Sequence, residues 1–169
     1  KYDERGRVLN EVKTINGTPS PFTTSWTYNS ADLPYQMTYP VDNEVLTYGY
    51  NSDGSLNSVT SSLGDTYLAS TKYDEAGRIK SMDYGASVIQ KVFTYFPWNT
   101  ATTGGLLNSA TATRLNDQTT IQNFAYTYDK NANVSTIMDN LAGPQTQTFG
   151  YDTLNRLTSA GVTGGTNGL

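Results

Sequence analysis

The sequence predicts an all-β protein made of antiparallel β-hairpin repeats, each about 22–23 residues long. Three observations predict this class. Tyrosine recurs at a nearly constant step. Tyr, Gly, Thr, Ser and Asn dominate the composition, and these residues favour strands or turns. Charged residues make up 15% of the chain, against about 25% in a typical soluble domain, and 12% are aromatic, which argues against disorder.

The repeat is marked by seven tyrosines in one array that spans residues 1–169. Their positions are Tyr2, Tyr28, Tyr50, Tyr73, Tyr95, Tyr128 and Tyr151. Four of the six steps are 22 or 23 residues, the first is 26 and the fifth is 33, so we expect an insertion at about residues 96–120. Because the chain opens inside a repeat and ends just after another, we expect it to be a fragment of a larger protein.

A polar turn follows each tyrosine. Asp or Asn stands first, where its side chain accepts a hydrogen bond from the backbone N–H two residues on. Gly stands fourth, where a left-handed residue closes a hairpin through a bulge. The predicted turn residues are Asp3, Gly6, Gly54, Asp74, Gly77, Asp129, Asp152 and Asn155. Ala132 departs from the pattern, and we expect local strain or a shifted turn there. We expect Arg7, Arg78 and Arg156 to pair with turn carboxylates or to lie along the sheet.

The strands are predicted from the residues that flank these turns. The residue two before the tyrosine is usually aromatic, as in Phe149/Tyr151, which places both on one face of a strand. Aliphatic residues three apart after the turn, such as Leu56 and Val59, share that face only if a bulge intervenes, and we favour the bulge. A second turn signal halfway, such as Gly64-Asp65, makes each repeat a hairpin. Because lone hairpins are marginally stable, neighbouring repeats should pair edge to edge.

These segments resemble the YD-repeat family, also called RHS repeats, whose unit reads roughly Y-D-x-x-G-R-L. The segments 73–79 (YDEAGRI) and 2–8 (YDERGRV) match it closely. Members include bacterial RHS proteins, the B–C shell of insecticidal toxin complexes, wall-associated proteins and teneurins. The resemblance implies a continuous curled or spiral sheet that forms part of a hollow shell. In the toxin members the shell encloses a toxin, and in the teneurin-like members it is an adhesion scaffold.

Our leading hypothesis is therefore a structural segment of such a shell, which encapsulates or scaffolds a toxin-like cargo in a secreted or surface protein of bacterial origin. The alternative is an extracellular adhesion or carbohydrate-binding module, or a self-associating surface fibre. Expected partners are flanking repeats, further copies through edge strands, a toxin polypeptide and, in the alternative, carbohydrate. Trp26 and Trp98 are the candidate sugar-stacking residues, although the aromatic ladder of the sheet explains them more economically.

The sequence lacks the residues or patterns typical of enzymes, metal sites, nucleic-acid-binding proteins and membrane spans. The chain contains neither His nor Cys, so the commonest general base and the commonest metal ligands are missing, and we expect no enzyme, cofactor or metal centre. Asp129-Lys130-Asn131 begins like a calcium loop, but Val134 replaces the required Gly and Asn140 the required Glu. The net charge is −4 with scattered basic residues, which disfavours nucleic acid. No apolar run reaches the length of a membrane span.

Overall fold

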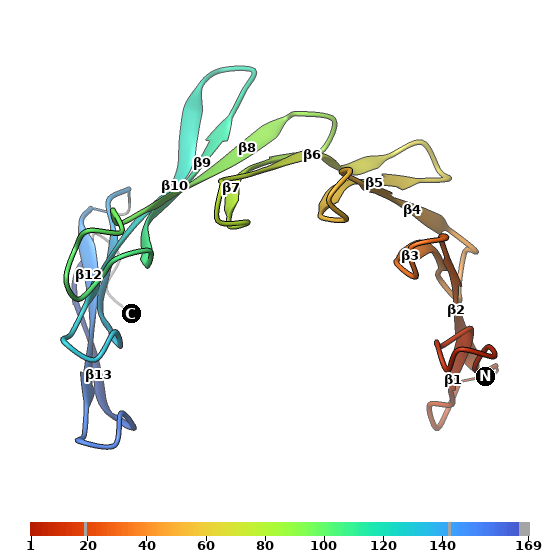
Figure 1. Ribbon diagram of the computed structural model, residues 1–169, viewed down its shortest axis with the longest axis horizontal. Helices are drawn as coiled ribbons and strands as arrows, with labels where there is room; N and C mark the ends of the chain where they lie inside the picture. The colour runs from red at the N-terminus through yellow and green to blue at the C-terminus, as the bar shows by residue number, and fades with distance from the viewer. Residues whose placement is uncertain (19, 142, 166–169) are drawn as a thin grey trace. The chain divides into compact units, whose positions relative to one another are not determined.

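The computed structural model describes residues 1–18, 20–141 and 143–165, and these form thirteen strands and no helix (Figure 1). None of the described residues forms a helix with the length and hydropathy needed to cross a bilayer. The chain divides into two compact units, Lys1–Lys72 with Asp83–Ser87 and Tyr73–Met82 with Val88–Leu169. The last four residues of the predicted array, 166–169, lie outside the described part.

The first half of the sequence supplies short strands separated by turns. Their bounds are β1 Asn10–Lys13, β2 Phe22–Tyr28, β3 Pro34–Thr38, β4 Val45–Tyr50, β5 Leu56–Ser61 and β6 Thr66–Tyr73. Consecutive strands pair antiparallel from β1 through β6. The register therefore confirms the predicted series of hairpins in this unit.

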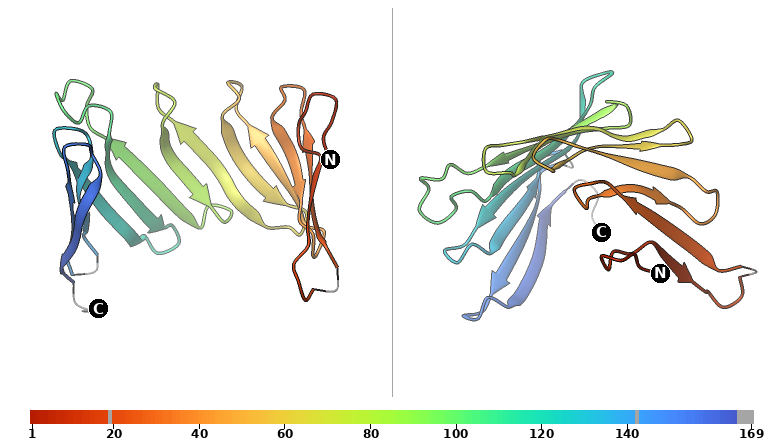
Figure 2. Two further views of the ribbon diagram at one scale, coloured as in Figure 1. Left: turned by 90° about the horizontal axis from the view of Figure 1, so that it is seen from below. Right: turned by 45° about the vertical axis from the view of Figure 1, so that its right-hand side comes forward.

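The second half repeats the pattern with longer strands in its middle. The bounds are β7 Ile79–Tyr84, β8 Ile89–Tyr95, β9 Leu107–Arg114, β10 Thr119–Tyr128, β11 Val134–Asp139, β12 Gln145–Tyr151 and β13 Leu157–Gly164. From β8 through β13 each strand again pairs antiparallel with the next. The strand order in the sheet is the order of the sequence, without a crossover, which confirms the all-β antiparallel class (Figure 2).

The predicted β-bulge is present beside every repeat tyrosine whose register is defined. In β4 and β5, Gly49 pairs with Ser58 but Tyr50 pairs with Leu56, so Asn57 is the extra residue. The same shift precedes Tyr28, Tyr95, Tyr128 and Tyr151. As a result Tyr48 pairs with Val59 and Tyr50 with Leu56, which returns both aliphatic residues to the tyrosine face. The bulge prediction is therefore confirmed.

The two faces of the sheet differ in chemistry. One face carries Trp26, Met37 and Leu46 as successive cross-strand partners, whereas Thr27, Gln36 and Thr47 succeed one another on the other face. This alternation separates aromatic and aliphatic residues from Thr and Gln, and it agrees with the expectation that aromatic and aliphatic residues share one face. Cross-strand pairs of this kind are the unit of sheet stabilisation.

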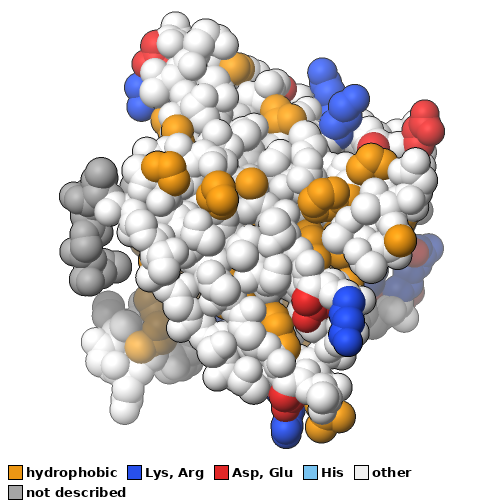
Figure 3. All heavy atoms as spheres, turned by 90° about the vertical axis from the view of Figure 1, so that its left-hand side faces the viewer, with side chains coloured by type: hydrophobic (Ala, Val, Ile, Leu, Met, Phe, Trp, Pro, Cys, Tyr) orange, Lys and Arg blue, Asp and Glu red, His pale blue; other side chains and the backbone are white. Residues whose placement is uncertain are grey.

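The hydrophobic core is thin. Among the described residues only Leu46, Leu68, Ala110 and Ala112 are buried hydrophobics, and no large side chain is fully buried. The surface in Figure 3 is mostly backbone and uncharged polar side chains, with hydrophobic and charged groups scattered between them. Stability must therefore come largely from the sheet ladders and from contacts between neighbouring repeats.

Candidate functional site

The segment 73–79 shows how the repeat builds its turn. The N–H of Gly77 donates to the carbonyl of Asp74 at 3.0 Å, and the N–H of Asp74 donates to the carbonyl of Arg78 at 2.9 Å. The Asp74 carboxylate accepts the N–H groups of Ala76 and Arg78 at 3.0 Å each. One aspartate side chain therefore satisfies two turn donors that would otherwise have to find water.

The other repeats form the same turn. The two backbone hydrogen bonds recur after Tyr2, Tyr28, Tyr50, Tyr128 and Tyr151. Asp3, Asn29, Asp129 and Asp152 each accept two backbone N–H groups as Asp74 does. Asn51 differs, because its side-chain amide donates to the Ser55 hydroxyl instead.

The fourth turn position is always left-handed. Its φ lies between 58° and 84° at Gly6, Asp32, Gly54, Gly77, Gly105, Ala132 and Asn155. Of the two alternatives expected at Ala132, strain or a shifted turn, the turn is not shifted, because the Ala132 N–H still donates to the Asp129 carbonyl at 3.1 Å. The expected strain is present instead, since Ala132 has a φ of 65°, a conformation that costs L-residues free energy.

The repeat at Tyr95 forms the same turn, but an inserted loop separates its first and fourth positions. Phe96 occupies the aspartate position and Gly105 the glycine position, and the N–H of Gly105 donates to the Phe96 carbonyl at 3.0 Å. The N–H of Phe96 donates to the carbonyl of Leu106 at 2.9 Å, as the first turn residue does elsewhere. Residues 97–104 loop out between these two positions. The sequence pattern missed this turn because the insertion separates its two ends.

Arginine connects neighbouring turns. As expected, Arg7, Arg78 and Arg156 form ion pairs with Asp3, Asp74 and Asp152. The Arg78 guanidinium also lies 4.1 Å from the Tyr95 ring centroid and 4.7 Å from that of Trp98, and it donates to the Gly105 carbonyl at 2.8 Å. Arg7 lies in the same way over the Tyr28 ring, at 4.4 Å. The arginine of one repeat is thus held by the tyrosine of the next.

The repeat tyrosine has a second role that the sequence pattern did not reveal. Its hydroxyl donates to a backbone carbonyl two residues after the left-handed position of the preceding turn. The bonds run from Tyr28 to Val8, Tyr50 to Pro34, Tyr95 to Ile79, Tyr128 to Leu107 and Tyr151 to Val134, at 2.6–3.0 Å. Each of these tyrosines therefore joins its own repeat to the one before. The sequence did contain one signal for this role, because a position that recurs as Tyr and not as Phe indicates that the hydroxyl is used.

These contacts shift the ionisation of the groups involved. The hydrogen bond from the Arg78 side chain is the largest cause that lowers the pKa of Asp74, and that from the Asn133 side chain lowers the pKa of Asp129. Burial raises the pKa of Asp3, but the hydrogen bonds from Arg7 and Arg5 outweigh it, so the net shift is downward. Burial also raises the pKa of Tyr95 and Tyr128. The carboxylates of Asp3, Asp74 and Asp129 are thus held as anions, and Tyr95 and Tyr128 as neutral donors.

The two candidate sugar-stacking residues have different surroundings. Trp26 is half-buried and lines a hollow with Tyr2, Val8 and Tyr28. Trp98 is exposed on the inserted loop, but Arg78 covers one side of its ring, and an added Cβ at Gly105 would clash with it at 2.2 Å. Trp98 thus packs against its own turn.

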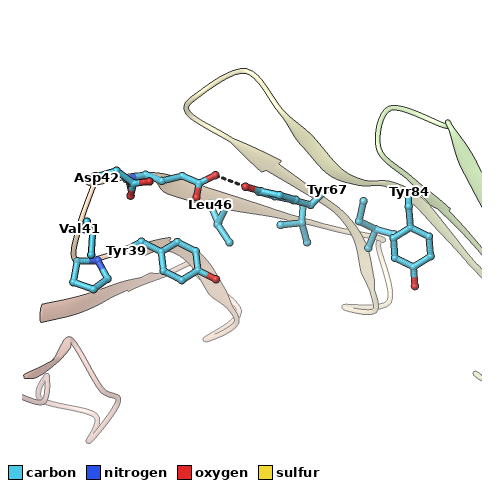
Figure 4. A pocket seen from close by; sticks show the side chains of 10 residues that line it. Tyr39, Val41, Asp42, Leu46, Tyr67 and Tyr84 are labelled. Atoms are coloured by element: carbon cyan, nitrogen blue, oxygen red, sulfur yellow. Dashed lines mark hydrogen bonds between the residues drawn. The ribbon is translucent and has the colours of Figure 1, made fainter. Parts of the chain in front are cut away.

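A groove in the first unit lies beside Leu46 and Leu68, and the sequence pattern did not indicate it. Six of its residues are Tyr39, Val41, Asp42, Glu44, Leu46 and Tyr67, and its volume is about 680 Å³; it is called the Glu44 groove below (Figure 4). Glu44 is buried, and its Oε1 accepts hydrogen bonds from the hydroxyls of Ser61 and Tyr67. The bond to Glu44 is the largest cause that raises the pKa of Tyr67.

In the described part of the chain, no three or more His, Cys, Asp or Glu side chains gather as a metal site would require. The oxygens of Asp129, the first residue of the calcium-like segment, accept the N–H groups of Asn131 and Asn133 and the side-chain amide of Asn133.

Comparison with known proteins gives matches in structure alone. No protein-family model and no curated protein sequence matches the chain. A crystal structure of TcdB2-TccC3 matches with a TM-score of 0.75 and 19% identity over 95% of this chain. The Photorhabdus luminescens Tc holotoxin pore with the TccC3-D651A mutation matches with a TM-score of 0.68 and 20% identity over 92%. The chain spans only 9% and 8% of those two chains. Together with the recurring Tyr-Asp turn, these likenesses show that the chain has the RHS/YD-repeat fold.

Proposed function

We propose that this chain is a wall segment of a YD-repeat shell in a secreted bacterial protein, and that the shell encloses a toxin-like polypeptide. Enclosure is a steric function, so it needs a continuous wall rather than a catalytic centre. The observation that carries the proposal is the hydroxyl bond from each of five repeat tyrosines to the preceding repeat. These bonds extend a sheet by adding repeats and do not close it into a compact domain.

Two further observations support the proposal. The fold matches chains of toxin complexes, of which this segment corresponds to less than a tenth. In addition, the outermost strand β13 is exposed along its whole length, and β1 is exposed at three of its four residues. Exposed edges of this kind pair with further strands, and flanking repeats of a longer wall would supply them.

The test uses the full-length protein that carries this segment. Limited proteolysis should leave the polypeptide downstream of the repeats intact for as long as the wall is intact. Gly77→Pro should expose that polypeptide, because proline cannot adopt the φ of 76° found at Gly77. Glu75→Pro is the matched control, since the second position of the turn favours proline.

The proposal is wrong if the downstream polypeptide is digested equally fast in the wild type and in Gly77→Pro. Saturable binding on a glycan array, combined with such an unprotected polypeptide, would favour the adhesion alternative instead.

A further inference from the structure

The Glu44 groove combines a buried acid with aromatic and aliphatic walls. Glu44 is 7% exposed. Its Oε1 accepts two hydrogen bonds, whereas its Oε2 accepts none from the described residues and, unlike Thr71 Oγ1, is not a buried atom without a partner, so it is open to the groove. The backbone N–H of Glu44 donates to Asp42, a second acid that lines the groove. A carboxylate that is mostly withdrawn from water is stabilised when a cation or a further donor reaches its accessible oxygen.

The groove has no positive charge of its own. Its described lining includes two carboxylates, three tyrosines and several aliphatic side chains, but neither Lys nor Arg. The turn carboxylates differ in this respect, because Asp3, Asp74 and Asp152 each have an arginine supplied by the same turn. Glu44 is therefore a buried carboxylate whose counter-ion would have to come from outside this part of the chain.

In the second unit, the carboxylate of Asp74 does have a counter-ion, the guanidinium of Arg78. The Arg78 guanidinium pairs with Asp74 at 2.6 Å and lies over the rings of Tyr95 and Trp98. The Glu44 groove contains the carboxylate and the rings of that arrangement, with Tyr67 bonded to Glu44 and Tyr39 in the same wall, but lacks the guanidinium (Figure 4).

We propose that the Glu44 groove binds an arginine side chain of an extended polypeptide segment. The guanidinium would pair with Glu44 Oε2 and lie against the tyrosine rings, and apolar neighbours of the arginine would pack on Val41 and Leu46. Arginine fits better than lysine because its planar, weakly hydrated group stacks on aromatic rings while one of its N–H groups donates to Oε2. A sugar hydroxyl would satisfy Oε2 but leave the buried charge unpaired.

This inference rests on the proposed function only for the source of the segment, which would be the enclosed polypeptide. The groove itself can be tested on the 169-residue chain alone. If the full-length protein fails to protect the downstream polypeptide, the proposed shell function is wrong but the proposed arginine binding is unaffected. If the groove fails to bind the arginine peptide, the proposed arginine binding is wrong but the shell function is unaffected.

The probe is a fluorescein-labelled peptide, Gly-Leu-Arg-Leu-Gly, followed by fluorescence anisotropy. A second peptide carries citrulline in place of arginine, which keeps the shape and removes the charge. We expect the arginine peptide to bind about tenfold more tightly than the citrulline peptide, since a tenfold ratio corresponds to a single charge-assisted contact. Glu44→Gln should remove this preference, whereas the exposed Glu4→Gln, with the same change in net charge, should keep it.

A second variant separates binding from folding, because Glu44→Gln also alters the bonds with Ser61 and Tyr67. Tyr39→Ala removes a ring from a residue that is 41% exposed and leaves the Glu44 side chain unchanged. It should lower the affinity for the arginine peptide about threefold and leave the melting temperature of the protein unchanged. Equal affinity for both peptides, full affinity in Glu44→Gln, or displacement of the peptide by neutral cellohexaose would each overturn the proposal.

Discussion

The turns after Tyr73 and Tyr128 have the same backbone conformation, but different side chains stabilise them. Both close with the same two backbone hydrogen bonds, and both use the aspartate to accept two N–H groups. In the first, Gly77 occupies the left-handed position and the Arg78 guanidinium contacts the rings of Tyr95 and Trp98. In the second, Ala132 occupies that position, and the uncharged Asn133 replaces the arginine.

The difference shows that the shape and the stability of a repeat have separate origins. The shape follows from the Tyr-Asp pair and the bulge, and it survives the loss of both Gly and Arg. The stability depends on how well each remaining position suits that shape. The turn after Tyr128 should therefore be the weaker of the two, and the following experiments test this.

The largest effect is expected from Arg78→Ala. It removes an ion pair, a hydrogen bond to the Gly105 carbonyl and contacts with two rings, and should lower the free energy of unfolding by about 2 kcal/mol. Asn133→Ala, the equivalent change in the other turn, should cost about 1 kcal/mol or less. Urea denaturation measures both values. Equal losses would mean that the stacked arginine adds nothing to the turn.

An intermediate effect is expected at the left-handed position. Ala132→Gly should stabilise the chain by about 1 kcal/mol, because glycine adopts a φ of 65° without strain. Gly77→Ala is the reverse change in the other turn and should destabilise by a similar amount, since nothing lies within 4 Å to clash with an added Cβ and only the backbone strain counts. Thermal melts of both variants measure this. A destabilising Ala132→Gly would contradict the assignment of strain.

The smallest effect is expected in the acid range. The folded pKa of Asp74 lies below its ordinary value, so its contribution to stability is fully present above about pH 4 and is lost as the pH falls through the folded pKa. Asp74→Asn should therefore lose less stability than the wild type on acidification. Melting temperatures measured from neutral pH downward show this as a flatter curve. If the melting temperatures of the wild type and of Asp74→Asn fall in parallel, the ionised Asp74 carboxylate does not stabilise the turn.

Much of the fold followed from the sequence because it depends on local chemistry. Tyrosine spacing located the strand ends, Asp and Gly located the turns, and the three-residue offset of Leu56 and Val59 predicted the bulge. These features are decided by a few adjacent residues, each with a strong backbone preference.

The remaining features depend on contacts between segments far apart in the sequence. The turn at Phe96 and Gly105 was hidden because eight residues separate positions that the other repeats separate by two. The hydroxyl bonds of the tyrosines connect residues 16–21 positions apart. The Glu44 groove unites residues from several strands around a carboxylate that belongs to no repeated position.

The repeat tyrosine holds each repeat to the one before through its hydroxyl. Strand β10 offers a matched pair for testing it. The Tyr128 hydroxyl donates to the Leu107 carbonyl at 2.8 Å, whereas the Tyr126 hydroxyl has no hydrogen-bond partner among the described residues. Denaturant unfolding of Tyr128→Phe should show a loss of about 1 kcal/mol, and Tyr126→Phe should lie within about 0.3 kcal/mol of the wild type. Equal effects in the two variants would contradict the claim.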